Sequence, residues 1–350
     1  MIQTYSTTIR RKEMDAVLTC MVDEKIGPGE INSKLIQQVK EFFKCDGAVA
    51  LRSPSIALKY ALKSLGLERG AKIMISALAP AWQYQTLVEF EMEPVILDVD
   101  ETTGLVNIDL IQDGMKKGGS ILLLHESEGI VPDMDSIMQL GIPVIEDISQ
   151  SAGASYTMKS LDGQELEKKR VGLFGVFSII GLEERDVLTA GGGAVLMAPG
   201  RREWTVLKKF TDEAAKTELL PDINCALASV QLKEFERNEK SRKEVFNIYQ
   251  HACLSSRHKM FPREMEDGST ASCFPLILNS PFKDVKQYAS RKDIEIQPAY
   301  EDSVIAVSEE AMENCIHAKS LYLRCAHIPL YPRLTHSEVA KITKVLGTLP

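Results

Sequence analysis

The most informative stretch of the sequence reads Pro143-Val144-Ile145-Glu146-Asp147-Ile148-Ser149-Gln150. It is a short apolar run that ends in two carboxylates, and such a run is typical of a buried strand. In doubly wound sheets, ligands bind beyond the carboxyl ends of the strands. We therefore expect Glu146 and Asp147 at the floor of a ligand crevice, where a charge must be paired or used. The alternative is that Asp147 only caps the next helix.

Short apolar strands alternate with helices on both sides of this stretch. The strand candidates are residues 48–51, 73–75, 94–97, 120–124, 143–145, 173–179 and 194–197. After the first of them, Ser53 and Pro54 provide an N-cap and a first-turn proline for a helix. This alternation predicts an α/β fold with a mainly parallel sheet and helices on both faces. Residues 156–170 break the pattern and predict a surface loop or hairpin.

The pattern changes after a long helical tract at residues 221–256. Strand candidates at 274–278 and 294–297 then lie among helices expected at 283–291, 309–323 and 335–346, and Thr335 with Glu338 forms a capping box for the last helix. We therefore expect a large domain over residues 1–235 and a smaller C-terminal α+β domain over residues 236–350.

The composition excludes several classes of protein. The 350 residues carry a net charge of −8, and no basic stripe suggests nucleic-acid binding. The apolar runs are far shorter than the ~20 residues of a membrane span, and charges near the start argue against a secretory leader. We expect a cytoplasmic protein that binds neither membranes nor nucleic acids.

Cysteine and histidine patterns give no sign of a metal centre. The seven cysteines form no CxxC pair, so we expect them to be reduced and buried, with no disulfide framework and no zinc site. The segment His125-Glu126-Ser127-Glu128-Gly129 could in principle hold a metal, but one histidine with two carboxylates is weak evidence. We interpret this segment as a solvated loop.

Four stretches, at residues 48–58, 93–100, 143–154 and 328–335, resemble the DegT/DnrJ/EryC1/StrS family of pyridoxal phosphate (PLP)-dependent nucleotide-sugar aminotransferases. The resemblance extends from about residue 10 to residue 346. It implies the fold-type-I architecture of aspartate aminotransferase, a nucleotide-sugar ligand, and PLP or pyridoxamine phosphate (PMP) as cofactor. It also implies a homodimer, with Thr217 near the partner's pocket, and a setting in polysaccharide or modified-sugar biosynthesis.

The resemblance also assigns roles to single residues. Asp147 matches the carboxylate that pairs with the cofactor's pyridinium nitrogen, and Gln150 matches the residue near its ring hydroxyl. Phosphate-binding positions are matched by Ser53, Ser55 and Ser178. Trp82 lies close to the aromatic residue that stacks on the cofactor, although an ungapped alignment puts Pro80 there. Tyr300 falls on a tyrosine near the substrate, and Gln297 lies in the same pocket.

The lysine that anchors the cofactor in this family has no counterpart between Ser178 and Gly191. Counting back from the Gly-rich turn puts Arg185 at that position, and counting forward from Ser178 puts Glu183 there. Neither side chain can hold the cofactor covalently, and arginine cannot be deprotonated to act as a base. Lysines 159, 168 and 169 precede the strand and would need their loop to fold back.

Five further positions depart from the family pattern, namely Pro54, Gly191, Thr217, Gln297 and Ala299. Three hypotheses follow. The chain is a degenerate member that does not transaminate and holds PLP or PMP noncovalently, if at all. Alternatively, it is a PMP-dependent, dehydratase-like enzyme, although that branch has a histidine at the lysine position and none occurs here. The third hypothesis is a transaminase whose lysine comes from elsewhere. We favour the first, with no catalytic residue certain.

Overall fold

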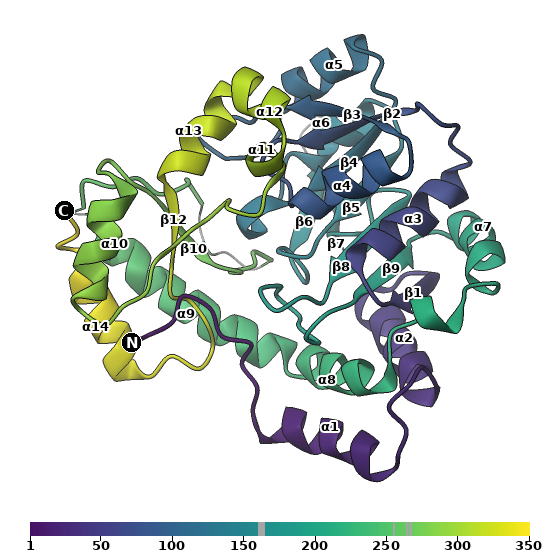
Figure 1. Cartoon of the computed structure of the whole chain (residues 1–350), viewed down its shortest axis with the longest axis horizontal. Coiled ribbons are helices and arrows are strands. Elements are labelled where there is room, and N and C mark those ends of the chain that lie inside the picture. The colour runs from purple at the N-terminus through teal and green to yellow at the C-terminus, as the bar shows by residue number, and fades with distance from the viewer. Residues whose placement is uncertain (160–164, 255, 264, 266–267) are drawn as a thin grey trace.

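A computed structural model describes residues 1–159, 165–254, 256–263, 265 and 268–350 of the chain. Within these residues, seven strands form a central sheet (Figure 1). In spatial order they are β1 (Gly47–Leu51), β9 (Ala194–Ala198), β8 (Phe177–Gly181), β5 (Val144–Asp147), β4 (Ile121–His125), β2 (Lys72–Ser76) and β3 (Glu93–Leu97). The pairs from β8 to β3 are parallel, whereas β9 is antiparallel to both β1 and β8. The expected mainly parallel sheet is confirmed.

Helices cover both faces of this sheet, because alternate strand residues face opposite sides. Ile73 and Ile75 pack in a core cluster with residues of α3, α4 and α7, whereas Met74 packs with residues of α5 and α6 on the other face. Towards β1, α2 and α8 cover that second face. The helices are α1 (Arg11–Val22), α2 (Glu30–Phe43), α3 (Pro54–Leu65), α4 (Ala81–Glu89), α5 (Ile108–Lys116), α6 (Met134–Gln139), α7 (Arg201–Thr211) and α8 (Asp222–Lys233).

The C-terminal part has a second sheet, antiparallel and in the order β10 (Phe274–Ile277), β12 (Cys325–Ile328), β11 (Gln297–Pro298). Its core is built with side chains of α9 (Phe235–Cys253), α10 (Phe282–Ser290) and α14 (His336–Leu346). The remaining helices are α11 (Val304–Val307), α12 (Glu309–Asn314) and α13 (Ile316–Arg324), with the short 3-10 turns η1 (Ser127–Gly129) and η2 (Lys216–Glu218). No described helix is long and apolar enough to span a bilayer.

Some boundaries differ from those expected. The long helical tract divides into α8 and α9, and the helix expected at 309–323 divides into α12 and α13 at Cys315. The strand expected at 294–297 shrinks to β11. The hairpin expected at 156–170 is present as β6 (Ser155–Lys159) and β7 (Glu165–Arg170), although its residues 160–164 lie outside the described part of the chain. The capping box of Thr335 and Glu338 is confirmed.

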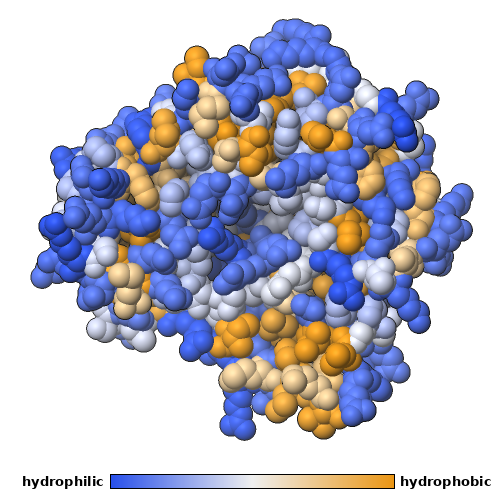
Figure 2. All heavy atoms as spheres, viewed as in Figure 1, coloured by the Kyte–Doolittle hydropathy of each residue, from blue (hydrophilic) through white to orange (hydrophobic). Residues whose placement is uncertain are grey.

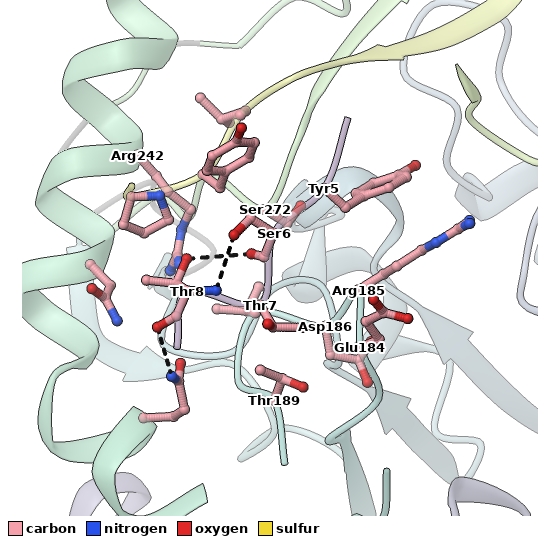
Figure 3. Close-up of a pocket in the computed structure, with 16 residues that line it drawn as sticks. Tyr5, Ser6, Thr7, Thr8, Glu184, Arg185, Asp186, Thr189, Arg242 and Ser272 are labelled. Carbon is pink, nitrogen blue, oxygen red and sulfur yellow. Dashed lines mark hydrogen bonds between the residues drawn. The ribbon is translucent and has the colours of Figure 1, made fainter. Parts of the chain in front are cut away.

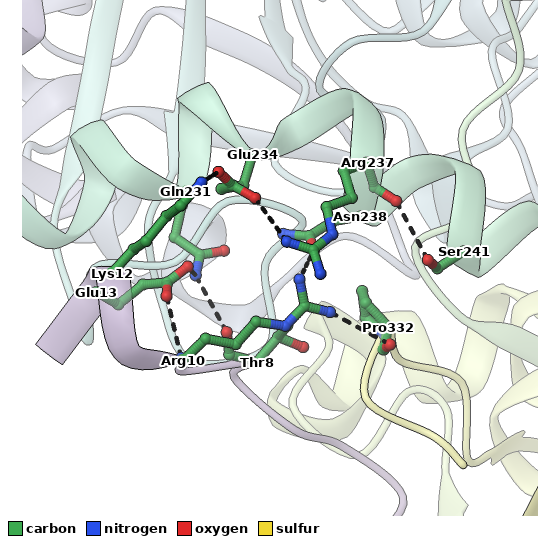
Figure 4. A network of polar contacts seen from close by, with 10 residues as sticks. All are labelled: Thr8, Arg10, Lys12, Glu13, Gln231, Glu234, Arg237, Asn238, Ser241 and Pro332. Carbon is green, nitrogen blue, oxygen red and sulfur yellow. Dashed lines mark hydrogen bonds and ion pairs between the residues drawn. The ribbon is translucent and has the colours of Figure 1, made fainter.

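The N-terminal segment connects the two parts of the molecule (Figure 4). Ile2 forms a β-bridge with Ile294 in the C-terminal part. Farther along, the Arg10 guanidinium donates to Asn238 Oδ1 at 3.2 Å and to the Pro332 carbonyl at 3.5 Å. The domain boundary expected at residue 235 stays a prediction. The first residues of the chain pack against the part that follows this boundary.

Candidate functional site

A cavity of about 500 Å³ lies at the carboxyl ends of the parallel strands, where the C-terminal part meets the central sheet. The sheet side contributes His125, Ser149 and Gln150. The start of α4 contributes Trp82, and the C-terminal part contributes, among others, Tyr300. A cavity of this size in this place is the default ligand site of an open α/β fold.

Asp147 is the best-bound carboxylate beside the cavity. It pairs in register with His125 of the neighbouring strand, and its Oδ2 accepts from His125 Nδ1 at 2.9 Å and from Gln83 Nε2 at 2.7 Å. Its Oδ1 accepts from the Ser149 hydroxyl at 2.5 Å. Burial raises the pKa of Asp147, but His125 and Ser149 lower it more, so that it lies below its ordinary value. Asp147 is thus ionised.

Asp147 itself is fully buried, whereas His125 and Ser149, which hold its carboxylate, line the cavity. Because a carboxylate only accepts hydrogen bonds, His125 carries its proton on Nδ1. Asp147 therefore fixes the tautomer and the orientation of a histidine at the cavity wall. A direct contact between Asp147 and a cofactor stays a prediction.

The segment from His125 to Gly129 is entirely buried, so its interpretation as a solvated loop is wrong. The C-terminal part covers it: a Cβ on Gly129 would lie 2.9 Å from the Thr270 carbonyl oxygen. Both carboxylate oxygens of Glu126 lack a hydrogen-bond partner among the described residues. Burial, and then the charge of Glu146, raise the pKa of Glu126 well above its ordinary value.

A second buried pair joins η1 to the C-terminal part of the chain beside the cavity. Glu128 Oε2 lies 2.6 Å from His327 Nε2 and 2.7 Å from Cys273 Sγ. Both His327 and Cys273 line the cavity. The Tyr5 hydroxyl contacts His327 Nδ1 at 2.5 Å. Burial raises the pKa of Glu128, but the neighbouring His327 lowers it more, and the net direction is downward.

The residues expected to bind phosphate do not gather at the cavity. Ser53 caps α3 by accepting from the Ile56 amide at 3.2 Å, and the fully buried Ser178 donates to the Gly172 carbonyl at 2.9 Å. Neither they nor Ser55, in the first turn of α3, belong to the described cavity lining. Pro54 does line it, and it has no N–H to donate. The phosphate-binding role of Ser53, Ser55 and Ser178 stays a prediction.

Both candidates for the lysine position, Glu183 and Arg185, line the cavity. Arg185 reaches across to the C-terminal part, where it donates to Glu301 Oε1 and to Gln297 Oε1, each at 3.2 Å. Its guanidinium carbon lies 4.6 Å from the centre of the Tyr5 ring (Figure 3). No lysine occurs among the described residues that line this cavity. Lys168 and Lys169 instead line a separate groove beside the β6–β7 hairpin.

Asp186 is a cavity residue that the sequence analysis missed. Its Oδ2 accepts from the Glu183 amide at 2.8 Å. Burial raises the pKa of Asp186 to about 8. Figure 3 shows Asp186 beside Arg185 in the wall of a smaller adjoining cavity of about 40 Å³. A carboxyl group that titrates near neutral pH can hold or release a proton inside the site.

Several residues of the cavity lining could contact the flat ring of PLP or PMP. Trp82 offers an aromatic face, and His125 and Gln150 offer polar groups in the same cavity. Gln150 Oε1 is already occupied by the Glu128 amide at 2.6 Å, which fixes the side chain. Neither Glu183 nor Arg185 carries an amine that could bond to an aldehyde. The cavity is large enough for a molecule of the size of PLP or PMP.

A model of the DegT/DnrJ/EryC1/StrS aminotransferase family matches residues 7–347. Among solved structures, the chain is similar to a candidate sugar aminotransferase from Streptococcus pneumoniae in its PLP form, at 17% identity, with 98% of this chain and 97% of that one covered and a TM-score of 0.86. The same protein in its PMP form is 16% identical, with 98% and 96% coverage and a TM-score of 0.85.

A third similar structure is the Escherichia coli GDP-4-keto-6-deoxy-D-mannose-3-dehydratase with bound hydrated PLP. It is 15% identical, covers 99% of both chains and has a TM-score of 0.82. These likenesses confirm the fold-type-I, aspartate aminotransferase-like architecture that the resemblance implies.

Proposed function

This chain belongs to the DegT/DnrJ/EryC1/StrS aminotransferase family, and we propose that it is a member that does not transaminate. The family is PLP-dependent, and one structural neighbour has been solved in both PLP and PMP forms. In our proposal the chain keeps a partial pocket that binds PLP or PMP noncovalently, or a nucleotide sugar. When bound, the cofactor ring supplies an electron sink.

The observation that supports this proposal is the composition of the cavity wall after β8. Glu183 and Arg185 occupy the stretch where a lysine is needed, and Arg185 is engaged by Glu301 and Gln297. A guanidinium remains protonated in a protein and is no nucleophile. Transamination needs an amine that bonds to the cofactor and then moves a proton. Nothing in the described cavity lining supplies one.

The second candidate is a PMP-dependent, dehydratase-like enzyme. The observation that favours it is His125, which lines the cavity and is held in one tautomer by Asp147. A histidine with a fixed tautomer can move protons near neutral pH without a lysine. The third hypothesis, a lysine supplied from elsewhere, has no comparable support, since Lys168 and Lys169 line another groove.

The test is a titration of the purified full-length chain with PLP and, separately, with PMP. Absorbance is recorded before and after borohydride, and the reduced protein is analysed by mass spectrometry. We expect no covalent adduct. A borohydride-stable adduct on one lysine would contradict the proposal and support an ordinary transaminase. Saturable PMP binding without an adduct, with sugar turnover, would favour the dehydratase-like enzyme.

We also propose that the chain forms a homodimer. Helix α1 and the residues after it expose an apolar surface, visible at the lower edge of Figure 2. Its side chains are each more than half exposed: Met14, Leu18, Met21, Val22 and Ile26. Contiguous apolar surface of this kind marks an interaction site. Sedimentation should give a dimer for the wild type and a weaker one for Leu18→Glu, and a monomeric wild type would refute this proposal.

The nucleotide-sugar ligand, the cytoplasmic location and the biosynthetic setting remain part of the proposal. The ligand and the setting depend on the family alone, whereas the location depends on the composition of the chain. The identity of the sugar is a separate question from the proposed absence of the lysine. A panel of nucleotide sugars in a thermal-shift assay would test the ligand class, because a ligand that binds only the folded state raises the melting temperature.

A further inference from the structure

Three potential metal ligands converge at the C-terminal wall of the cavity, although the sequence gives no sign of a metal centre. They are Glu128, Cys273 and His327, and their ligand atoms all lie within 4.8 Å of one another. All three residues are buried, and they come from η1, from the residue before β10 and from β12. Residues so far apart in the chain, 199 positions in the case of Glu128 and His327, meet only in the folded protein.

The geometry points to a divalent zinc-type site, in which Glu128 Oε2, Cys273 Sγ and His327 Nε2 move apart from their present hydrogen-bond distances of 2.6 Å and 2.7 Å to bind the ion between them. A thiolate, an imidazole and a carboxylate together select Zn²⁺ and similar ions over Mg²⁺ and Ca²⁺. Three protein ligands leave a fourth tetrahedral position open. Because Cys273 and His327 line the cavity, that position faces the ligand site.

Two buried hydroxyls line the cavity wall next to Glu128. Ser127 precedes Glu128 in η1, and the hydroxyl of Tyr300 interacts with that of Ser127. Apart from this mutual contact, neither hydroxyl has a hydrogen-bond partner among the described residues. Buried polar atoms are normally satisfied by protein groups, water or ions, so a water or substrate oxygen in the cavity would give them a further partner.

Tyr5 and Arg263 already orient two of the ligands. Tyr5 Oη lies 2.5 Å from His327 Nδ1, so that Nδ1 can donate to Tyr5 while Nε2 binds the ion. Arg263 donates to the carbonyl oxygens of Glu128 at 2.5 Å and of Thr270 at 2.8 Å, which fixes the loop that carries Glu128. Ion binding displaces the thiol proton of Cys273 to solvent. The carboxylate and the thiolate then neutralise the charge of the ion, and Arg263 contributes one remaining positive charge.

The experiment uses the full-length chain, freed of metal with a chelator and free of any cofactor. Zn²⁺ alone is titrated and the bound metal is measured by elemental analysis. Co²⁺ alone is then added, because a cobalt–thiolate bond absorbs strongly in the near ultraviolet. We expect about one metal ion per chain and a cobalt–thiolate band. Tyr5→Phe should weaken zinc affinity about 10-fold.

Cys273→Ser should abolish the cobalt–thiolate band. The matched control is Cys45→Ser, another buried cysteine, which packs in the core cluster between α2 and β1 and should leave the band and the affinity unchanged. If Cys273→Ser fails to fold, His327→Asn takes its place. A wild type that binds less than about one tenth of an equivalent would overturn the proposal, as would a band that persists in Cys273→Ser. Since no cofactor is present, these outcomes do not depend on the proposed function.

Discussion

Two buried carboxylate–histidine pairs lie beside the same cavity. Asp147 and His125 are neighbours on adjacent parallel strands, and Gln83 and Ser149 complete the carboxylate's hydrogen bonds. Glu128 and His327 lie on separate parts of the chain, and a cysteine takes the place of the hydroxyl and amide donors. The first pair is held by the central sheet, whereas the second exists only because the C-terminal part docks against η1.

This difference in donors separates what the two pairs can do. The hydroxyl of Ser149 and the amide of Gln83 can only stabilise the Asp147 carboxylate, which in turn orients His125. A thiol can also lose its proton and become a metal ligand, which makes the Glu128 cluster a candidate for binding chemistry. We therefore interpret the Asp147 pair as a positioning unit and the Glu128 pair as a ligand site.

The largest expected effect is the loss of Asp147. Asp147→Ala removes the acceptor of His125, Gln83 and Ser149 from a fully buried place. Breaking such a buried network should lower the free energy of unfolding by about 3–5 kcal/mol. Urea denaturation measures this value. Asp212→Ala, at the exposed end of α7, is the control and should change it by less than about 0.5 kcal/mol. A loss below about 1 kcal/mol for Asp147→Ala would remove the basis of the comparison.

The sequence predicts one pair far better than the other. A parallel strand that ends in Asp147 places that residue at the crevice, and the preceding strand ends in His125, so the rule of strand ends could also have identified His125. The polar residues after His125 instead suggested a solvated loop. That interpretation is wrong because burial here comes from a distant segment, which no local pattern reveals. Cys273 and His327 show no metal-ligand spacing in the sequence, because only the fold brings these distant residues to Glu128.

A smaller effect is expected from Glu128→Gln. The substitution keeps the shape of the side chain but places an amide N–H₂ where one carboxylate oxygen stood, so that the donors from His327 and Cys273 lose a charged acceptor. We expect the free energy of unfolding of the metal-free protein to fall by about 1–3 kcal/mol. Urea denaturation of this variant in parallel with Asp147→Ala ranks the two pairs. A larger loss at Glu128 would reverse their order and make the second pair the main structural one.

A third prediction concerns Asp186, whose side chain lines the same cavity. Its pKa is raised from 3.8 to about 8 by burial, so between these pH values the folded state binds a proton that the unfolded state has released. Asp186 therefore lowers stability as pH rises from about 4 to about 8. Asp186→Asn should gain stability over the wild type across this range, by about 1 kcal/mol or more between pH 5 and pH 8. Chemical denaturation at several pH values measures the difference, and a constant difference would contradict the assignment.

The smallest effect is expected at Arg185, which connects the lysine-position loop to the C-terminal part. Its ion pair with Glu301 is half exposed on both sides, and its guanidinium packs over Tyr5. Exposed pairs and cation–π contacts are each worth about 1 kcal/mol or less, so Arg185→Ala should reduce stability by about 0.5–1 kcal/mol.

Arg185→Lys provides the matched control, because it keeps the charge and introduces an amine at the cavity. If PLP and borohydride then label Lys in that variant but not in the wild type, an amine at this position is enough for covalent attachment of the cofactor. If they do not, the surrounding cavity has also changed, and Glu183→Lys tests the other alignment of the same loop.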